Sequence, residues 1–474
     1  MKRKRSTRVP LAAEYSEAQL GDRRLDSRLE RLAELAARKP GASLPHVSGN
    51  DAELEGAYRF LSNSRVTCRA ILAPHIRETV GRVGNGDNVV VAHDTTEFNF
   101  GSKPREDLGR VGQGKSFGFY GHFALAVNAA DGRRPLGVLG LRMHRRHGGV
   151  GKRGHRKLAS DPNNEGHRWL KLVEEVEQAV GPHVRPLHVM DREGDAYALM
   201  AALVGRGSRF VIRMAQDRRL ILGQDKTERV CDALKRAPVL THREVPITAR
   251  GRSKMPSYRK NFPERNARLA RLEVSTELVN LLRPDSAPRE CPLTLNVGVV
   301  RVFEPSPPDG EPPIEWRLWT SEPTESATAA LSVIDAYRCR WRIEEYFKAL
   351  KSGCAIEQRQ LESFRALANA LCLYLPIAWR ILLLRTLARE DATRPASSAL
   401  NPVQLICLRA ALRKLKRPPL GPHPTARSAW LGVAGLGGHI TNNGDPGWIV
   451  LARGMDTLIT IEAGYNLASI ARKM

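Results

Sequence analysis

Cysteines are few in this sequence, and they form no recognisable group. The 474 residues include seven cysteines, which are scattered along the chain and form no CxxC pair. An odd and dispersed set argues against a disulfide framework and against a zinc site, and it fits a reducing compartment. The basic N-terminal segment also lacks the apolar stretch of a secretory signal, so we expect a cytoplasmic protein.

Acidic residues are scarce relative to basic ones. Lys and Arg together number 75 against 50 Asp and Glu, which leaves a net charge of +25. This excess predicts a polyanionic partner, with nucleic acid as the first candidate and an anionic membrane surface as the alternative. The most apolar run, residues 371–388, is interrupted by Pro376, Arg380 and Arg385. It therefore predicts a buried core helix rather than a membrane span.

The first eighty residues combine a helical pattern with many arginines. Leucines recur near the helical period between residues 20 and 35, and Pro40 ends the pattern. Arg23 and Arg24 stand at its start. Residues 1–80 therefore predict a small helical DNA-binding module. Solvated arginines on a helical bundle explain this stretch equally well.

Two short apolar runs each lead into an aspartate. The run Val89–Val91 predicts a strand buried on both faces that ends at Asp94, and Leu187–Met190 predicts a second one that ends at Asp191. For either aspartate alone, a strand end or a turn is the commoner role. A functional interpretation of the two requires a third acid, which is Glu344.

Antiparallel strands are expected after the first of these runs. Alternation through Phe98 and Phe100 predicts a second strand, and residues 117–130 and 136–143 predict two more, joined by a turn. Farther along, the segment RFVIR predicts a strand that ends in Arg213.

The remaining segments differ in composition. Residues 144–168 are typical of a basic loop, and a metal site at His144 and His147 is disfavoured because no acid or cysteine stands at matching spacing. Residues 220–315 predict a β-rich insertion with a basic loop. Several helices and a proline-rich linker are expected between residue 366 and residue 474.

The stretch YRCRWRIEEYFKALK predicts one continuous helix, because it contains no Gly or Pro. At about 100° per residue, one face carries a phenol, three cations and a single acid. These residues are Tyr337, Arg340, Glu344, Lys348 and Lys351. Ile343, Tyr346, Phe347 and Leu350 form a separate apolar stripe. The segregated face suits a metal-binding carboxylate flanked by phosphate-holding side chains, although a solvated face with i,i+4 ion pairs is the simpler explanation.

Three carboxylates on separate elements of a basic protein fit two-metal phosphoryl transfer. Asp94, Asp191 and Glu344 offer the oxygen ligands that Mg²⁺ prefers, and Asp94 is expected to bridge the ions. Two ions about 3.5–4 Å apart activate the attacking oxygen and stabilise the leaving one.

These motifs resemble those of the DDE transposases of the insertion-sequence-four family, and within it the Tn-five transposase subgroup. The resemblance rests on Asp94 in DTT, Asp191 in DRE and Glu344 in the pattern Y-x2-R-x3-E-x6-K. It extends to LGDRR, EGAYRFL, RFVIR, W-x4-SEP, RWRIEE and LGGHI, in that order along nearly the whole chain.

The resemblance implies a specific architecture. It implies an α/β, ribonuclease-H-like catalytic core at residues 81–365, with a mixed five-stranded sheet, flanking helices and the β-rich insertion at 220–315. It implies that residues 1–80 bind terminal inverted repeats and that the helical region 366–474 pairs two protomers. The partners would be double-stranded DNA and a second copy of the chain, and the cofactors two Mg²⁺ ions, which Mn²⁺ would replace.

The resemblance also implies a reaction and residue roles. Water nicks one strand, the freed 3′-OH forms a hairpin on the opposite strand, and the reopened end joins target DNA. Trp316 would stack on a flipped base, or alternatively belong to the strand core. Tyr337, Arg340 and Lys351 would hold neighbouring phosphates. Lys348 and Arg213 would contact DNA near the metals, and Arg23 and Arg24 would contact the terminal repeat.

Two other classes of function remain open from the sequence. One is a DNA-binding protein without catalysis, such as a transposition inhibitor, which binds DNA in a salt-sensitive way and never cuts it. The other is a ribonuclease-H-like nuclease or resolvase, which cuts branched or hybrid substrates without strand transfer.

Overall fold

The computed structural model describes residues 10–84, 89–146, 166–223, 226–252, 263–440 and 444–471. The chain divides into two compact units. Unit 1 comprises residues 1–150, 174–184 and 341–474, and unit 2 comprises residues 151–173 and 185–340. His147, considered above as a metal ligand, lies outside the described residues.

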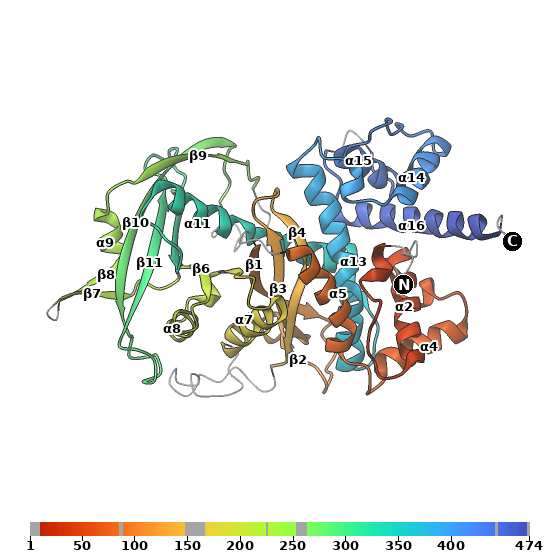
Figure 1. The fold of residues 1–474 in the computed structure, drawn as a ribbon, viewed down its shortest axis with the longest axis horizontal. Helices are drawn as coiled ribbons and strands as arrows, with labels where there is room; N and C mark the ends of the chain where they lie inside the picture. The colour runs from red at the N-terminus through yellow and green to blue at the C-terminus, as the bar shows by residue number, and fades with distance from the viewer. Residues whose placement is uncertain are drawn as a thin grey trace. The chain divides into compact units, whose positions relative to one another are not determined.

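The strands of unit 1 form an antiparallel group (Figure 1). β1 (Val89–Asn99) pairs with β3 (Ser116–Asn128), and β3 pairs in turn with β2 (Gly109–Val111) and β4 (Arg134–His144). The predicted antiparallel strands after residue 116 are therefore confirmed. Val89 to Ala92 are buried, as the apolar run predicts.

Two expectations for this strand are wrong. Asp94 does not end the strand but lies near its middle, opposite Phe123 of β3. The alternation at Phe98 belongs to the same strand, so no second strand begins there. The polar residues after Ala92 interrupt the apolar pattern, but main-chain pairing with β3 does not depend on them. The β-branched Thr95 and Thr96 also favour extended backbone.

The N-terminal residues of unit 1 are helical, as predicted. Their helices are α1 (Pro10–Ala13), α2 (Arg23–Arg38), α3 (Leu44–Val47), α4 (Asp51–Ser62) and α5 (Cys68–Val83). Asp22 caps α2 by accepting the Arg24 N–H at 2.9 Å, and Asn50 caps α4 in the same way from Glu53. Leu29, Leu32 and Leu35 form the buried stripe of α2.

The predicted core helix is α13 (Phe364–Glu390), which packs against α2, α4 and α5 (Figure 1). By length and composition it is long enough to cross a membrane, but a core helix passes the same test. Its most apolar stretch is 89% buried inside the protein, so α13 belongs to the core of unit 1. The helices α14 (Pro402–Lys414), α15 (Ala426–Leu436) and α16 (Trp448–Ala471) follow it, and the predicted proline-rich linker separates α14 from α15.

A buried polar network ties α5 to the N-terminal segment and to β4. The His75 Nδ1 atom lies 2.5 Å from Glu14, and the Val138 N–H donates to His75 Nε2 at 3.0 Å. His75 is therefore neutral with its proton on Nδ1. Burial lowers the pKa of His75. Burial alone would raise the pKa of Glu14, but the hydrogen bonds from His75 and Arg82 and the positive charge of Arg82 hold it below its usual value.

This network predicts an acid-sensitive fold. A folded-state pKa below the unfolded value means that the unfolded chain binds more protons, so the stabilisation is complete above pH 6.5 and is lost as the pH falls toward the folded pKa of His75. Urea unfolding is expected to show a free energy of unfolding that falls between pH 6.5 and pH 5.5 by about 1.4 kcal/mol per pH unit at most. His75→Gln, which keeps a donor and an acceptor but does not titrate, should flatten this slope. An unchanged slope in that variant would contradict the assignment.

Unit 2 combines a parallel strand pair with a long antiparallel extension (Figure 1). β5 (Leu187–Met190) and β6 (Arg209–Arg213) are parallel, and α8 (Tyr197–Arg206) connects them. β12 (Glu315–Thr320) pairs with β6, and β11 (Thr294–Phe303) and β10 (Arg268–Leu282) continue the sheet. Both predicted strands, at 187–190 and 209–213, are confirmed.

The β-rich segment at 220–315 is confirmed, with one refinement. Its further elements are β7 (Arg219–Gly223), β8 (Lys226–Arg229), α9 (Val230–Arg236) and β9 (Thr241–Ile247). Because β12 joins β11 to β6, these strands extend the sheet that contains β5 and β6 instead of forming a separate one. Trp319, Val299 and Phe210 lie in one apolar core under it. The expected five-stranded sheet is therefore too small.

The single helix expected at 337–351 is interrupted. α11 (Ala327–Cys339) ends before Arg340, α12 covers Trp341–Lys348, and a π-helical turn, η3, covers Ala349–Gly353. Arg340 keeps helical dihedral angles, but its N–H donates to the Tyr337 carbonyl three residues back, at 3.0 Å. The apolar stripe of the prediction is nevertheless buried, with Ile343, Tyr346 and Leu350 each 0% exposed.

Candidate active site

Asp94 is positioned by the middle of β1 in unit 1. It is half-buried, and its Oδ1 accepts the Thr95 N–H at 2.8 Å. The neighbouring Thr95 hydroxyl lies 3.0 Å from Nδ1 of His122 on β3. His93, on the opposite face of β1, is completely buried and stacks against His122 at 5.8 Å. The strand thus fixes Asp94 more firmly than a position after a strand end would.

Glu344 comes from α12, which packs against β1 in the same unit. It is half-buried, whereas the adjacent Glu345 is buried. Glu345 accepts from Arg342 at 2.5 Å and lies 3.5 Å from Arg389, so its charge is neutralised inside the unit. The two acids therefore differ in burial: Glu345 belongs to an ion-pair network inside the unit, and Glu344 is the less buried of the two.

Asp191 follows β5 in unit 2, where the sequence places it. Its side chain accepts the Glu193 N–H at 2.9 Å and caps a short 3₁₀ turn, η2 (Arg192–Gly194). Asp195, four residues later, is different. It is buried, accepts the N–H groups of Ala215 and Gln216, and pairs with Arg218 at 2.6 Å. Asp195 is therefore structural and Asp191 is the accessible acid.

An aromatic and cationic cluster in unit 2 brings together four of the predicted DNA contacts. The Trp316 ring on β12 meets the Tyr337 ring edge-on, with centroids 5.5 Å apart. The Arg340 guanidinium lies 6.0 Å from the Tyr337 ring centroid. Burial raises the pKa of Tyr337, while the positive charges of Arg340 and Arg213 oppose that rise. Trp316, Tyr337, Arg340 and Arg213 therefore share one location.

Trp316 is not a core residue of its strand. It is half-buried opposite Val302 of β11, whereas Trp319 of the same strand is 0% exposed. This difference leaves part of the Trp316 ring available for another aromatic surface.

Two family models match the chain. Residues 11–66 match a transposase DNA-binding model, and residues 158–379 match a transposase DDE domain model. The chain is a DDE transposase. Its catalytic domain is of the ribonuclease-H-like kind, and such enzymes cleave and transfer DNA strands with divalent metal ions.

The second match contains Asp191 and Glu344 but not Asp94. A solved structure of a piggyBac transposase synaptic complex with hairpin DNA also resembles the chain. It is 10% identical, over 82% of this chain and 70% of that one, with a TM-score of 0.33. A likeness that weak informs neither the fold nor the mechanism.

The acids of this transposase suit divalent metal ions by their chemistry. Asp94 and Glu344 are half-buried carboxylates in one unit, and Asp191 is a half-buried carboxylate in the other. Carboxylate oxygens are the ligands of Mg²⁺ and Mn²⁺. Within the described ranges, no three His, Cys, Asp or Glu side chains form a group that could hold a metal ion.

Two lysines of the transposase follow Glu344 on the chain. Lys348 is exposed, with its Nζ 5.8 Å from the Trp341 ring centroid. The Lys351 Nζ donates to the Glu97 carbonyl of β1 at 2.5 Å and lies 3.4 Å from Glu357. Lys348 can therefore reach a phosphate directly. Lys351 can bind a phosphate only after it gives up its contact with Glu97 or Glu357.

Glu357 was not predicted as a residue of the site. Its Oε1 accepts the Asn99 N–H at 2.9 Å, so that it holds both Lys351 and the end of β1. No motif or spacing marks this residue, because its role depends on a contact across 258 positions of the chain.

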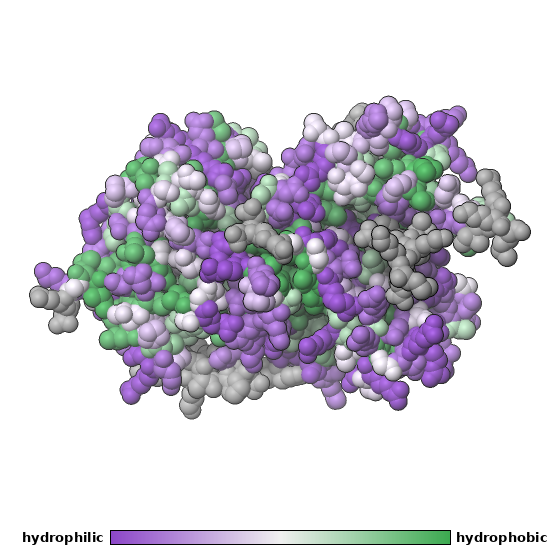
Figure 2. All heavy atoms as spheres, in the orientation of Figure 1, coloured by the Kyte–Doolittle hydropathy of each residue, from purple (hydrophilic) through white to green (hydrophobic). Residues whose placement is uncertain are grey.

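The predicted contacts in the N-terminal module lie on α2 of unit 1. Arg23 and Arg24 are exposed, and the Arg24 guanidinium, 91% exposed, pairs with Asp22 at 3.0 Å. Together with Ser27, Arg28 and Arg31 they line an open hollow of about 440 Å³. The visible face over α2 and α4 is mostly hydrophilic (Figure 2). This surface lies within the matched DNA-binding region.

Proposed function

We propose that the chain is a cut-and-paste transposase of the hairpin-forming, insertion-sequence-four type. The observation that carries the proposal is that α12, which bears Glu344, packs against β1, which bears Asp94, in a chain whose DDE-domain match contains Asp191 and Glu344. It binds terminal inverted repeats, cleaves the element ends and joins the 3′-OH ends to target DNA.

Asp94, Asp191 and Glu344 are the proposed ligands of two divalent ions, Mg²⁺ or Mn²⁺. When bound, the ions activate the attacking oxygen and stabilise the leaving one. The three side chains supply oxygen ligands and negative charge. The strand pairing of Asp94 and the buried ion pairs of Glu345 keep two of the carboxylates in place.

The aromatic cluster serves the hairpin step. Trp316 stacks on a base flipped out of the duplex, which relieves the tight bend of the hairpin. Arg340 and Arg213 hold phosphates beside it, with Tyr337 between them and Trp316. Lys348 and Lys351 extend the cationic surface beside Glu344.

Trp316→Ala is expected to slow hairpin formation and leave the first nick intact. Base stacking on an aromatic side chain contributes about 1–3 kcal/mol, which corresponds to a loss of roughly 5- to 150-fold in the hairpin step. Nick and hairpin rates are read separately from a denaturing gel. Trp316→Phe, which keeps a stacking face, should recover most of the rate. If the rates of nicking and of hairpin formation fell by the same factor, Trp316 would have a structural role in its strand instead.

The three parts of the chain have separate roles in this reaction. Residues 1–80 recognise the terminal repeat through Arg23 and Arg24, residues 81–365 catalyse, and the helices of residues 366–474 pair two protomers in a synaptic complex. Cleavage then occurs in trans within that dimer. The enzyme acts in the bacterial cytoplasm, on the nucleoid when bound to DNA.

A cleavage assay on a denaturing gel tests the proposed function. Purified protein is mixed with end-labelled DNA that carries the flanking sequence of its own gene, with Mg²⁺, Mn²⁺ or EDTA. A metal-dependent nick at the element boundary, followed by a hairpin at twice the strand length, supports the transposase. A gel shift without cleavage in either metal would support a silent DNA-binding protein, and cleavage of branched DNA without strand transfer would support a nuclease.

A further inference from the structure

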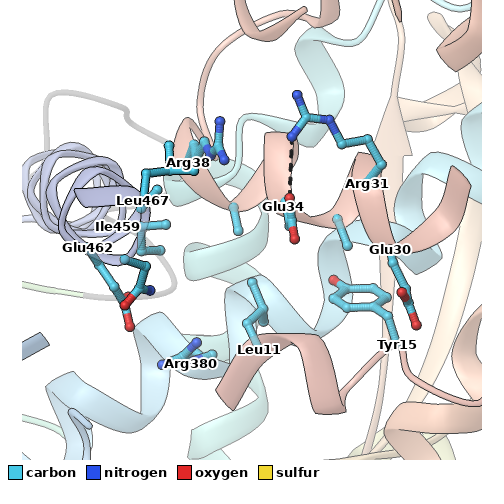
Figure 3. Close-up of a pocket in the computed structure, with 14 residues that line it drawn as sticks. Leu11, Tyr15, Glu30, Arg31, Glu34, Arg38, Arg380, Ile459, Glu462 and Leu467 are labelled. Carbon is cyan, nitrogen blue, oxygen red and sulfur yellow. Dashed lines mark hydrogen bonds and ion pairs between the residues drawn. The ribbon is translucent and has the colours of Figure 1, made fainter. Parts of the chain in front are cut away.

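A cavity of about 470 Å³ lies in unit 1 between α2, α13 and α16 (Figure 3). Its size is typical of small-molecule sites. Much of its wall is apolar, and the apolar side chains are Leu11, Ala33, Ala37, Ile459, Ala463 and Leu467. None of the proposed catalytic residues lines this cavity, and it shares Arg31 with the open hollow on α2.

Arg380 of α13 is the charged residue that the core contributes to the cavity wall (Figure 3). Its Nη1 atom is buried and makes no hydrogen bond with the part of the chain that the structure describes. Removal from water lowers the pKa of Arg380, and the more distant charges of Glu462 and Glu14 oppose that change. A buried guanidinium N–H without a partner is costly, so the site favours an added acceptor.

Three other polar side chains of the cavity wall, those of Glu462, Tyr15 and Glu34, have hydrogen-bond or ion-pair partners of their own. Both Glu462 oxygens accept from α14, one from Asn401 and one from Gln404, each at 2.8 Å. The Tyr15 hydroxyl donates to the Leu373 carbonyl at 2.5 Å. At the rim, Glu34 pairs with Arg31 at 3.4 Å. None of these acids lies within ion-pair distance of Arg380, as far as the described residues go.

We propose that this cavity binds a small amphiphilic organic anion, whose carboxylate pairs with Arg380 and whose apolar body lies against Leu11, Ile459 and Leu467. Water alone satisfies the guanidinium poorly, because water in a largely apolar cavity finds few polar partners. A free inorganic anion would leave the apolar wall uncovered. An amphiphile meets both requirements at once.

Such a ligand would join three segments that are far apart in the sequence. α2 belongs to the matched DNA-binding region, and α16 is the last helix of the chain. A molecule that binds only the folded protein raises its melting temperature in proportion to the logarithm of its concentration. Occupancy of the cavity would therefore hold α16 against α2 and α13.

Isothermal titration of the full chain with decanoate tests the proposal. Decanol and acetate are the matched probes, since each carries one half of the ligand chemistry. Decanoate is expected to bind at one site per chain and to raise Tm, with decanol and acetate at least tenfold weaker. Equal binding of decanoate and decanol, or no binding of decanoate at millimolar concentration, would overturn the proposal.

Arg380→Gln identifies the residue responsible. The variant should bind decanoate at least tenfold more weakly and should keep or increase its own Tm, because a buried unpartnered charge is removed. Arg385→Gln, on the same helix, is the control. The Arg385 guanidinium covers the Trp448 ring at 4.4 Å and lines no part of the cavity. Unchanged decanoate binding in Arg380→Gln would contradict the assignment. Ala463→Phe, which fills the cavity and leaves Arg380 in place, should also abolish binding.

Discussion

Glu344→Gln is expected to abolish DNA cleavage while leaving the protein folded and able to bind DNA. The substitution keeps the shape of a half-buried side chain on α12 and removes one metal-binding carboxylate. Loss of a ligand from a two-metal site removes several kcal/mol of transition-state stabilisation, which corresponds to roughly a thousandfold or more in rate. Asp94→Asn and Asp191→Asn, together with the alanine variants of all three acids, should behave in the same way.

Single-turnover cleavage on a denaturing gel measures this effect, and a gel shift on the same samples checks DNA binding. Glu97→Gln is the control on β1. Glu97 lies three residues from Asp94, and its side chain accepts the Gly112 N–H at 3.0 Å. Glu97→Gln should cleave within a few-fold of the unmodified protein. If a variant of Asp94, Asp191 or Glu344 cleaved DNA as fast as the unmodified protein, that residue would not belong to the active site.

Asp195→Asn is expected to destabilise unit 2 by about 3–5 kcal/mol, because it leaves a buried guanidinium without its counter-charge. The Asp195 side chain is 0% exposed and that of Arg218 is 5% exposed, with 2.6 Å between them. The other Asp195 oxygen accepts two main-chain N–H groups, from Ala215 and Gln216. The NH₂ group of an asparagine would face either these two N–H groups or the Arg218 guanidinium, and all of these are hydrogen-bond donors.

Chemical unfolding followed by tryptophan fluorescence measures this loss, since Trp319 lies in the core of unit 2. Asp191→Asn is the matched comparison four residues earlier. Its side chain caps one short turn, so about 1 kcal/mol or less is expected. We thus expect Asp195 to contribute to stability and Asp191 to catalysis. A larger loss from Asp191→Asn than from Asp195→Asn would reverse the roles assigned to them.

Local patterns predicted much of this fold. The apolar runs at Val89 and Leu187 become buried strands, and the stripe through Ile343 and Leu350 becomes the buried side of α12 and η3. These predictions succeed because side-chain periodicity reports burial directly.

The errors come from features that side chains do not encode. β1 continues beyond Asp94 because main-chain pairing with β3 carries it, and the helix expected at 337–351 is interrupted at Arg340 by a local change in hydrogen bonding. The joining of β12 to β6 and the support of Lys351 by Glu357 are long-range contacts. Spacing along the chain contains no information about either.

The central claim is that Asp94, Asp191 and Glu344 hold the divalent ions together. Electron paramagnetic resonance of Mn²⁺ bound to the complex of the protein with its element-end DNA tests this most directly. The account predicts about two bound ions per active site in the unmodified protein. It also predicts a clear loss of bound Mn²⁺ in each of Asp94→Asn, Asp191→Asn and Glu344→Gln. The same number of bound ions in any one of these variants as in the unmodified protein would contradict it.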